Sequence, residues 1–108
     1  MKKRKPSGNK ILNRLRIELD SLFGSRLEKV VLYGSRARGK AHADSDYDIA
    51  VFLKDYKDRF AEFEKITPIQ TDLLEETGAL ISPMVFRAAD YAQQTGLMHN
   101  IRNEGIPL

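Results

Sequence analysis

Two aspartates separated by a single residue, Asp46 and Asp48, are the side chains of this chain best suited to chemistry. They lie at the start of an apolar segment, 47–52, whose composition predicts a strand. Because side chains alternate across a strand, both carboxylates are expected to project from the same face. Like charges this close repel each other unless a cation neutralises them. The pair therefore predicts a site for Mg²⁺ or Mn²⁺, although a solvated strand end would show the same pattern.

A polar segment punctuated by glycines, 34–39, lies upstream of these aspartates and directly follows another short β-rich run. Gly34 and Ser35, placed between a strand and an expected helix, would offer free backbone N–H groups to a phosphate. The hydroxyl of Ser35 and the guanidinium groups of Arg36 and Arg38 would add donors. The segment therefore predicts a phosphate-binding turn.

These two features complement each other chemically. Phosphate donors end one predicted strand, and paired carboxylates begin the next. Such an arrangement can hold a nucleoside triphosphate and its metal ion in one cleft.

The elements that would position these residues follow from the spacing of apolar side chains. Helical spacing covers 11–23 and 58–77, and apolar runs predict strands over 30–33, 47–52 and 80–86. Another helix is expected between the first two strands, and a last one from residue 87. The predicted order is αβαβαβα, an α+β fold with one small sheet flanked by helices. A Ser-Pro pair at 82–83 favours an edge position or a bulge for the third strand, and Pro68 would start a new helix or mark a kink.

Length and composition limit the remaining alternatives. The chain has 108 residues, which suits one domain; we expect a basic flexible tail over 1–10 and a single domain over 11–108. Cysteine is absent, and there are only two histidines, so a metal site would need oxygen ligands. No apolar run is long enough to span a membrane, and no secretory signal is recognisable. We expect a cytoplasmic protein.

The charge is distributed unevenly along the chain. Residues 1–40 carry a net charge of +9 and residues 41–108 a net charge of −6. The basic opening, residues 2–5, is typical of a solvated tail, and contact with a nucleic acid is the alternative. The asymmetry also suits a partner of opposite surface charge.

The segment 34–51 as a whole closely resembles the signature of the nucleotidyltransferase superfamily related to DNA polymerase β. The resemblance rests on Gly-Ser, Arg-x-Arg-Gly, Ser-Asp-x-Asp and the following apolar strand. The small size of the chain is most similar to that of the minimal nucleotidyltransferases. The resemblance implies a small mixed sheet packed against helices, and transfer of a nucleoside monophosphate, with AMP favoured, from an NTP to a hydroxyl.

Carried over residue by residue, the resemblance implies that Gly34 and Ser35 hold phosphates and that Asp46 and Asp48 bind Mg²⁺ or Mn²⁺ and are catalytic. Arg36 or Arg38 would assist the phosphates, while one of them could instead form a structural ion pair. Family members also use a third carboxylate on a later strand. The matching segment, 80–86, contains no Asp or Glu, and Ser82 or its neighbours stand in its place. Substitutes considered are Asp44, Glu75, Glu76 and Asp90, each better explained by solvation.

The resemblance also implies a partner, because minimal nucleotidyltransferases are often paired with a small helical protein of the HEPN class. In such pairs the helical protein can be a toxin, which the nucleotidyltransferase neutralises. Two hypotheses therefore stay open: an enzyme that modifies a macromolecular hydroxyl, and a catalytically weakened subunit that binds an NTP or only neutralises its partner. A nucleic-acid-binding module and a homo-oligomer are further alternatives, the former weakened by the lack of an aromatic stacking series.

Overall fold

The structure is a computed structural model, and it describes residues 9–42 and 45–108. The helices are α1 (Lys10–Phe23), α2 (Arg59–Thr77) and α3 (Gly96–Glu104), with 3₁₀ segments η1 (Gly24–Arg26) and η2 (Ala88–Ala92). The strands are β1 (Leu27–Tyr33), β2 (Tyr47–Leu53), β3 (Ile81–Arg87) and β4 (Ile106–Pro107). Among the described residues, no helix has the length and apolar content needed to cross a membrane.

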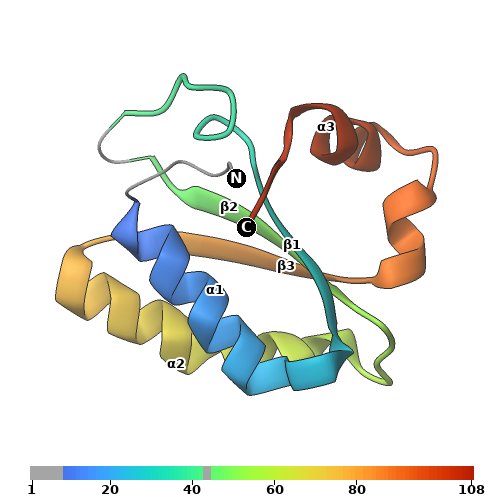
Figure 1. Cartoon of the computed structure of the whole chain (residues 1–108), viewed down its shortest axis with the longest axis horizontal. Coiled ribbons are helices and arrows are strands. Elements are labelled where there is room, and N and C mark those ends of the chain that lie inside the picture. Colours follow the sequence, from blue (N-terminus) through green and yellow to red (C-terminus); the bar gives the residue numbers. More distant parts are fainter. Residues whose placement is uncertain (1–8, 43–44) are drawn as a thin grey trace.

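The four strands form one mixed sheet in the order β3-β2-β1-β4. Strands β2 and β3 are parallel, whereas β1 is antiparallel to both β2 and β4. Helices α1 and α2 cover one face, and η2 and α3 lie on the other (Figure 1). The α+β fold class with a small mixed sheet flanked by helices is therefore confirmed.

Strand β2 is buried on both faces and joins two apolar cores. Its residues from Ile49 to Leu53 are 0% exposed, as a central strand between two layers should be. Alternation sends Ile49 and Val51 toward α1 and α2, and Ala50 and Phe52 toward α3. Asp48 lies two residues before Ala50, so its side chain belongs to the α3 face.

Strand β3 lies at an edge of the sheet, as the Ser-Pro pair predicts. Its outward backbone groups are partly satisfied, because Gln70 donates a hydrogen bond to the Ile81 carbonyl at 3.0 Å and the Arg87 amide donates to Asp90 at 3.1 Å. Pro83 lies two residues after Ile81, so its backbone faces the same outward edge, and a proline has no N–H to present there. The edge is therefore poorly suited to pairing with a further strand.

The structure corrects four details of the predicted elements. The described residues between β1 and β2, 34–42 and 45–46, do not form the expected helix, and the segment from Ser35 to Gly39 forms turns instead. The tail from residue 88 is a 3₁₀ segment followed by α3, and β4 was not predicted. Helix α2 continues through Pro68 without a break. The basic tail predicted over 1–10 falls largely on residues 1–8, which lie outside the described residues.

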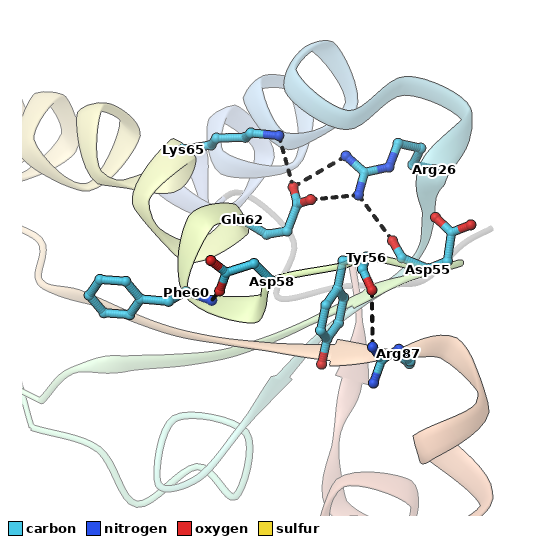
Figure 2. A network of polar contacts seen from close by, with 8 residues as sticks. All are labelled: Arg26, Asp55, Tyr56, Asp58, Phe60, Glu62, Lys65 and Arg87. Carbon is cyan, nitrogen blue, oxygen red and sulfur yellow. Dashed lines mark hydrogen bonds and ion pairs between the residues drawn. The ribbon is translucent and has the colours of Figure 1, made fainter.

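Buried Glu62 organises a polar network at the end of the sheet where β1 begins (Figure 2). Arg26 donates to both of its carboxylate oxygens, at 3.2 and 2.8 Å, and Lys65 donates to it at 3.1 Å. Arg26 also donates to the backbone carbonyl of Asp55 at 3.0 Å. These bonds connect η1, the segment after β2, and the first turns of α2.

Candidate active site

Asp46, Asp48 and Ser82 share the face of the sheet that α3 partly covers. Asp48 and Ser82 are register partners in the parallel β2–β3 pair, so their side chains leave the sheet on the same side. The Ser82 hydroxyl donates a hydrogen bond to Asp46 Oδ2 at 3.0 Å, which places the Asp46 carboxylate on that side too. Both aspartates therefore lie on one face of the sheet, as the alternation along the strand predicts.

Asp48 also lies against Gly34, at the end of β1. A Cβ atom on Gly34 would be 2.2 Å from Asp48 Oδ2, a distance that real Cβ atoms do not adopt. Gly34 has a φ of 77°, in the left-handed region that favours glycine. A glycine is thus needed here both for the turn and for the carboxylate beside it.

The electrostatics of Asp48 are those of a carboxylate placed beside another. Burial and the negative charge of Asp46 raise the pKa of Asp48, while the positive charge of Arg38 opposes that rise. Burial and Asp48 likewise raise the pKa of Tyr33, its register partner on β1. The two carboxylates repel each other, and a bound cation would relieve that repulsion.

The segment after Gly34 closes on itself through backbone hydrogen bonds. The amides of Ala37 and Arg38 donate to the Gly34 carbonyl at 3.1 and 3.2 Å, and the Lys40 amide donates to the Ser35 carbonyl at 3.0 Å. Because no helix begins in this segment, the prediction that the start of a helix would offer its N–H groups to a phosphate is wrong. The Ser35 hydroxyl and the neighbouring arginine side chains are donors that do not depend on a helix.

The two arginines of this turn have different environments, and Arg36 is held within the fold. Its guanidinium lies 3.9 Å from the ring centre of Tyr47, which belongs to the core beneath α1 and α2. It donates to the carbonyls of Ser45 and His42 at 2.9 and 3.3 Å. Arg36 therefore ties the turn to the segment that leads into Asp46. Tyr47 points away from the aspartates.

Arg38 is an arginine whose positive charge acts on Asp48. Its guanidinium also pairs with Glu104 of α3 at 3.3 Å, and both side chains are 41% exposed. An exposed ion pair of this kind is weak, so the guanidinium can exchange partners at little cost. Glu104 is a neighbour that the sequence pattern did not reveal, because it is 66 residues away along the chain.

No third carboxylate joins Asp46 and Asp48 in the described part of the chain. There, no three His, Cys, Asp or Glu side chains form a group that could hold a metal ion. Two of the substitutes considered are engaged elsewhere: Glu76 pairs with Arg14, and Asp90 caps η2. Asp44 lies outside the described residues. Ser82 stands on β3 beside the pair, in the segment where the resemblance implies a third carboxylate.

The donor set nevertheless fits a hard divalent cation. Asp46 and Asp48 supply carboxylate oxygens on one face, and Ser82 orders one of them. Mg²⁺ is commonly bound through one or two carboxylates together with substrate phosphates, and it keeps several waters. Two carboxylates beside a turn with hydroxyl and guanidinium donors match that pattern.

Comparison with known proteins agrees with this geometry. The family described as "Polymerase beta, Nucleotidyltransferase" matches residues 9–108. The chain therefore belongs to the polymerase β nucleotidyltransferase family, and the class of enzyme that this membership assigns is nucleotidyltransferase.

The individual proteins that resemble this chain have low sequence identity to it. A protein of Methanocaldococcus jannaschii, named as a candidate protein adenylyltransferase, is 25% identical over 96 residues, which cover 89% of this chain and 93% of that protein. A crystal structure of a mutant MntA–HpeT toxin–antitoxin gives a TM-score of 0.61 at 22% identity, covering 88% of this chain and 69% of that one. A candidate minimal nucleotidyltransferase gives a TM-score of 0.59 at 22% identity, covering 91% and 92%. These structural likenesses support the fold.

Proposed function

We propose that this protein transfers a nucleoside monophosphate, with AMP favoured, from an NTP to a hydroxyl of a protein or other macromolecule, in a reaction that depends on Mg²⁺ or Mn²⁺. The observation that carries the proposal is the shared face of Asp46 and Asp48 beside the turn that begins at Gly34. A relative named as a candidate protein adenylyltransferase supports AMP and a protein acceptor.

In the proposed mechanism, the acceptor hydroxyl oxygen attacks the α-phosphorus while the bond from that phosphorus to the bridging oxygen of the β-phosphate breaks. Pyrophosphate leaves, and the hydroxyl proton passes to solvent. Asp46 and Asp48 would hold the cation, and Ser35 and Arg38 would bind and orient the phosphates. Gly34 leaves room for the Asp48 carboxylate, and Arg36 fixes the segment before Asp46. A bound divalent cation supplies charge neutralisation and Lewis-acid polarisation of the phosphate oxygens.

We further propose that the protein acts in the cytoplasm as the antitoxin-like subunit of a pair with a small helical protein of the HEPN class. Three of the similar structures are toxin–antitoxin complexes, and one of them contains AMP-PNP. The likeness to them is one of fold, and the uneven charge along this chain suits a partner of complementary surface.

The transfer can be tested with ATP labelled on its α-phosphate. The protein is expressed with its neighbouring genes, and the proteins that co-purify with it serve as acceptors. We expect label to move to a co-purified protein in the presence of Mg²⁺, and not in the presence of EDTA or with Asp46→Asn. Label that stays in ATP with every co-purified protein present would contradict the enzymatic proposal.

A second candidate function is a catalytically weakened subunit that binds an NTP or only neutralises its partner. The absence of a third carboxylate from β3 favours it. Losing a positioned base or metal ligand costs on the order of 10² to 10⁴ in rate. Metal-dependent ATP binding without transfer of label would support this candidate, whereas transfer would exclude it.

A further inference from the structure

Ser82 lies beside both aspartates of the candidate site but comes from a different strand. It is the register partner of Asp48, and its hydroxyl donates to Asp46 Oδ2 at 3.0 Å. A serine hydroxyl has a single proton, and in this structure that proton is used for the bond to Asp46. Ser82 therefore connects β3 directly to the carboxylate at the start of β2.

Asp46 needs such a contact more than Asp48 does. It precedes the first residue of β2, so it has no ladder partner of its own. Its two neighbours are anchored by their backbones: the Tyr47 amide donates to the Leu80 carbonyl at 2.8 Å, and the Ser45 amide donates to the His42 carbonyl at 3.0 Å. A carboxylate at this position loses rotamer freedom on binding a cation unless a donor has already fixed it. The part-buried bond from Ser82 supplies that donor.

The hydroxyl also keeps the local charge low. Strand β3 has the sequence ISPMVFR and contributes no carboxylate, so the pair is ordered by a neutral group. An anionic side chain at position 82 would add a third negative charge to two that already repel. The same position on the sheet is, however, within reach of Asp46, so a carboxylate placed there could share a cation with it.

We propose that Ser82 is a positioning residue for the cation: it holds Asp46 in the orientation in which Asp46 and Asp48 bind a divalent ion together. Position 82 is then also the place where a third carboxylate ligand can be introduced. This inference rests on the proposed function, since it requires the two aspartates to hold a cation.

The test is a titration of the nucleotide-free protein with Mn²⁺ alone, followed by electron paramagnetic resonance and calorimetry. Ser82→Ala removes the donor and should weaken Mn²⁺ binding by about 10- to 100-fold, the usual effect of losing a group that orients a metal ligand. Ser82→Thr keeps the hydroxyl and should bind as the wild type does. Met84→Leu, on the same strand and face, is the matched control and should leave the affinity unchanged.

The variant Ser82→Asp tests the same position in the opposite direction. Without metal its melting temperature should fall below that of the wild type, because three carboxylates repel. Mn²⁺ should restore it, and the affinity for Mn²⁺ should rise by about tenfold or more, since ligand charge tunes the affinity of such sites. This result does not depend on whether Ser82→Ala folds well.

Equal Mn²⁺ affinities of the wild type and a folded Ser82→Ala variant would overturn the role of Ser82 and leave the proposed function intact. So would a Ser82→Thr variant that binds as poorly as Ser82→Ala, because the hydroxyl would then not be what matters. A Ser82→Asp variant without any gain in Mn²⁺ affinity would also contradict the inference. A wild-type protein that binds no Mn²⁺, with or without an ATP analogue, would instead refute the metal dependence of the proposed function itself.

Discussion

Asp48 shows how one residue of the candidate site depends on the atoms around it. Its carboxylate lies where only a glycine at position 34 leaves room, and the charge of Asp46, two residues upstream, acts on it. Changing the neighbour should therefore be as harmful to function as changing the aspartate.

Gly34→Ala tests that dependence. The added Cβ would lie 2.2 Å from Asp48 Oδ2, so the carboxylate must move. A misplacement of about 1 Å can cost about 10²-fold in rate. Transfer of label from ATP and Mg²⁺-dependent ATP binding are the measurements.

Gly39→Ala is its matched control. Gly39 has a φ of 74°, close to that of Gly34, but an added Cβ would meet nothing within 4 Å. Both variants should lose about 1–2 kcal/mol of unfolding free energy to the left-handed backbone. Only Gly34→Ala should lose function; an equal loss in both would mean that the contact with Asp48 is unimportant.

The ion pair between the turn and α3 gives a prediction at the scale of elements. Arg38 pairs with Glu104 at 3.3 Å and also acts on Asp48. If Arg38 binds phosphate, Glu104 competes for it. Glu104→Ala should therefore raise ATP affinity by about two- to fivefold, because exposed ion pairs contribute about 0.2–1 kcal/mol. Calorimetry measures this, with Glu64→Ala on α2 as control. A fall in affinity would indicate that Glu104 holds Arg38 in its working position.

The network around Glu62 connects elements at the other end of the sheet (Figure 2). Hydrogen bonds from Arg26, with help from Lys65, lower the pKa of Glu62. Glu62→Gln should cost about 1–3 kcal/mol of unfolding free energy at neutral pH, since it weakens charged hydrogen bonds at a buried site. Denaturant unfolding measures the cost.

The pH dependence of that loss follows from the lowered pKa. The stabilisation is fully present above the unfolded-state pKa, near 4.5, and disappears as the pH falls through the lower folded-state pKa. The difference between wild type and Glu62→Gln should thus shrink in acid, whereas the exposed Glu64→Gln should behave like wild type throughout. A difference as large at pH 3 as at neutral pH would contradict the role of the charge.

The sequence was most informative where local periodicity and burial agree. Helix α1 and strand β2 show uninterrupted patterns, and their predicted bounds match within a few residues. The helix expected after Gly34 failed because the segment has no apolar stripe to bury. Strand β4 was missed because two residues pair with β1 only through the tertiary fold. The bond from Ser82 to Asp46 required knowledge of the β2–β3 register, which no local pattern contains.

At the scale of the whole molecule, the distribution of charge distinguishes a nucleotidyltransferase from a nucleic-acid-binding module. The first 40 residues carry +9, and a nucleic-acid-binding module would use that excess. Deleting residues 1–8 leaves the Asn9 cap of α1 in place. Our account predicts unchanged Mg²⁺-dependent ATP binding in this variant. A nucleic-acid contact would instead appear as a salt slope of RNA binding reduced by about 3, the effect of losing four basic residues.

The central claim is that Asp46 and Asp48 together hold the cation that makes triphosphate binding possible. The most direct measurement is calorimetric titration with an ATP analogue whose α–β bond cannot be cleaved, with Mg²⁺ or with EDTA. Our account predicts binding by the wild type only with Mg²⁺, and a loss of at least about tenfold in Asp46→Asn and Asp48→Asn, with melting temperatures unchanged or raised. Equal affinity in the wild type and both variants, or binding indifferent to Mg²⁺, would contradict it.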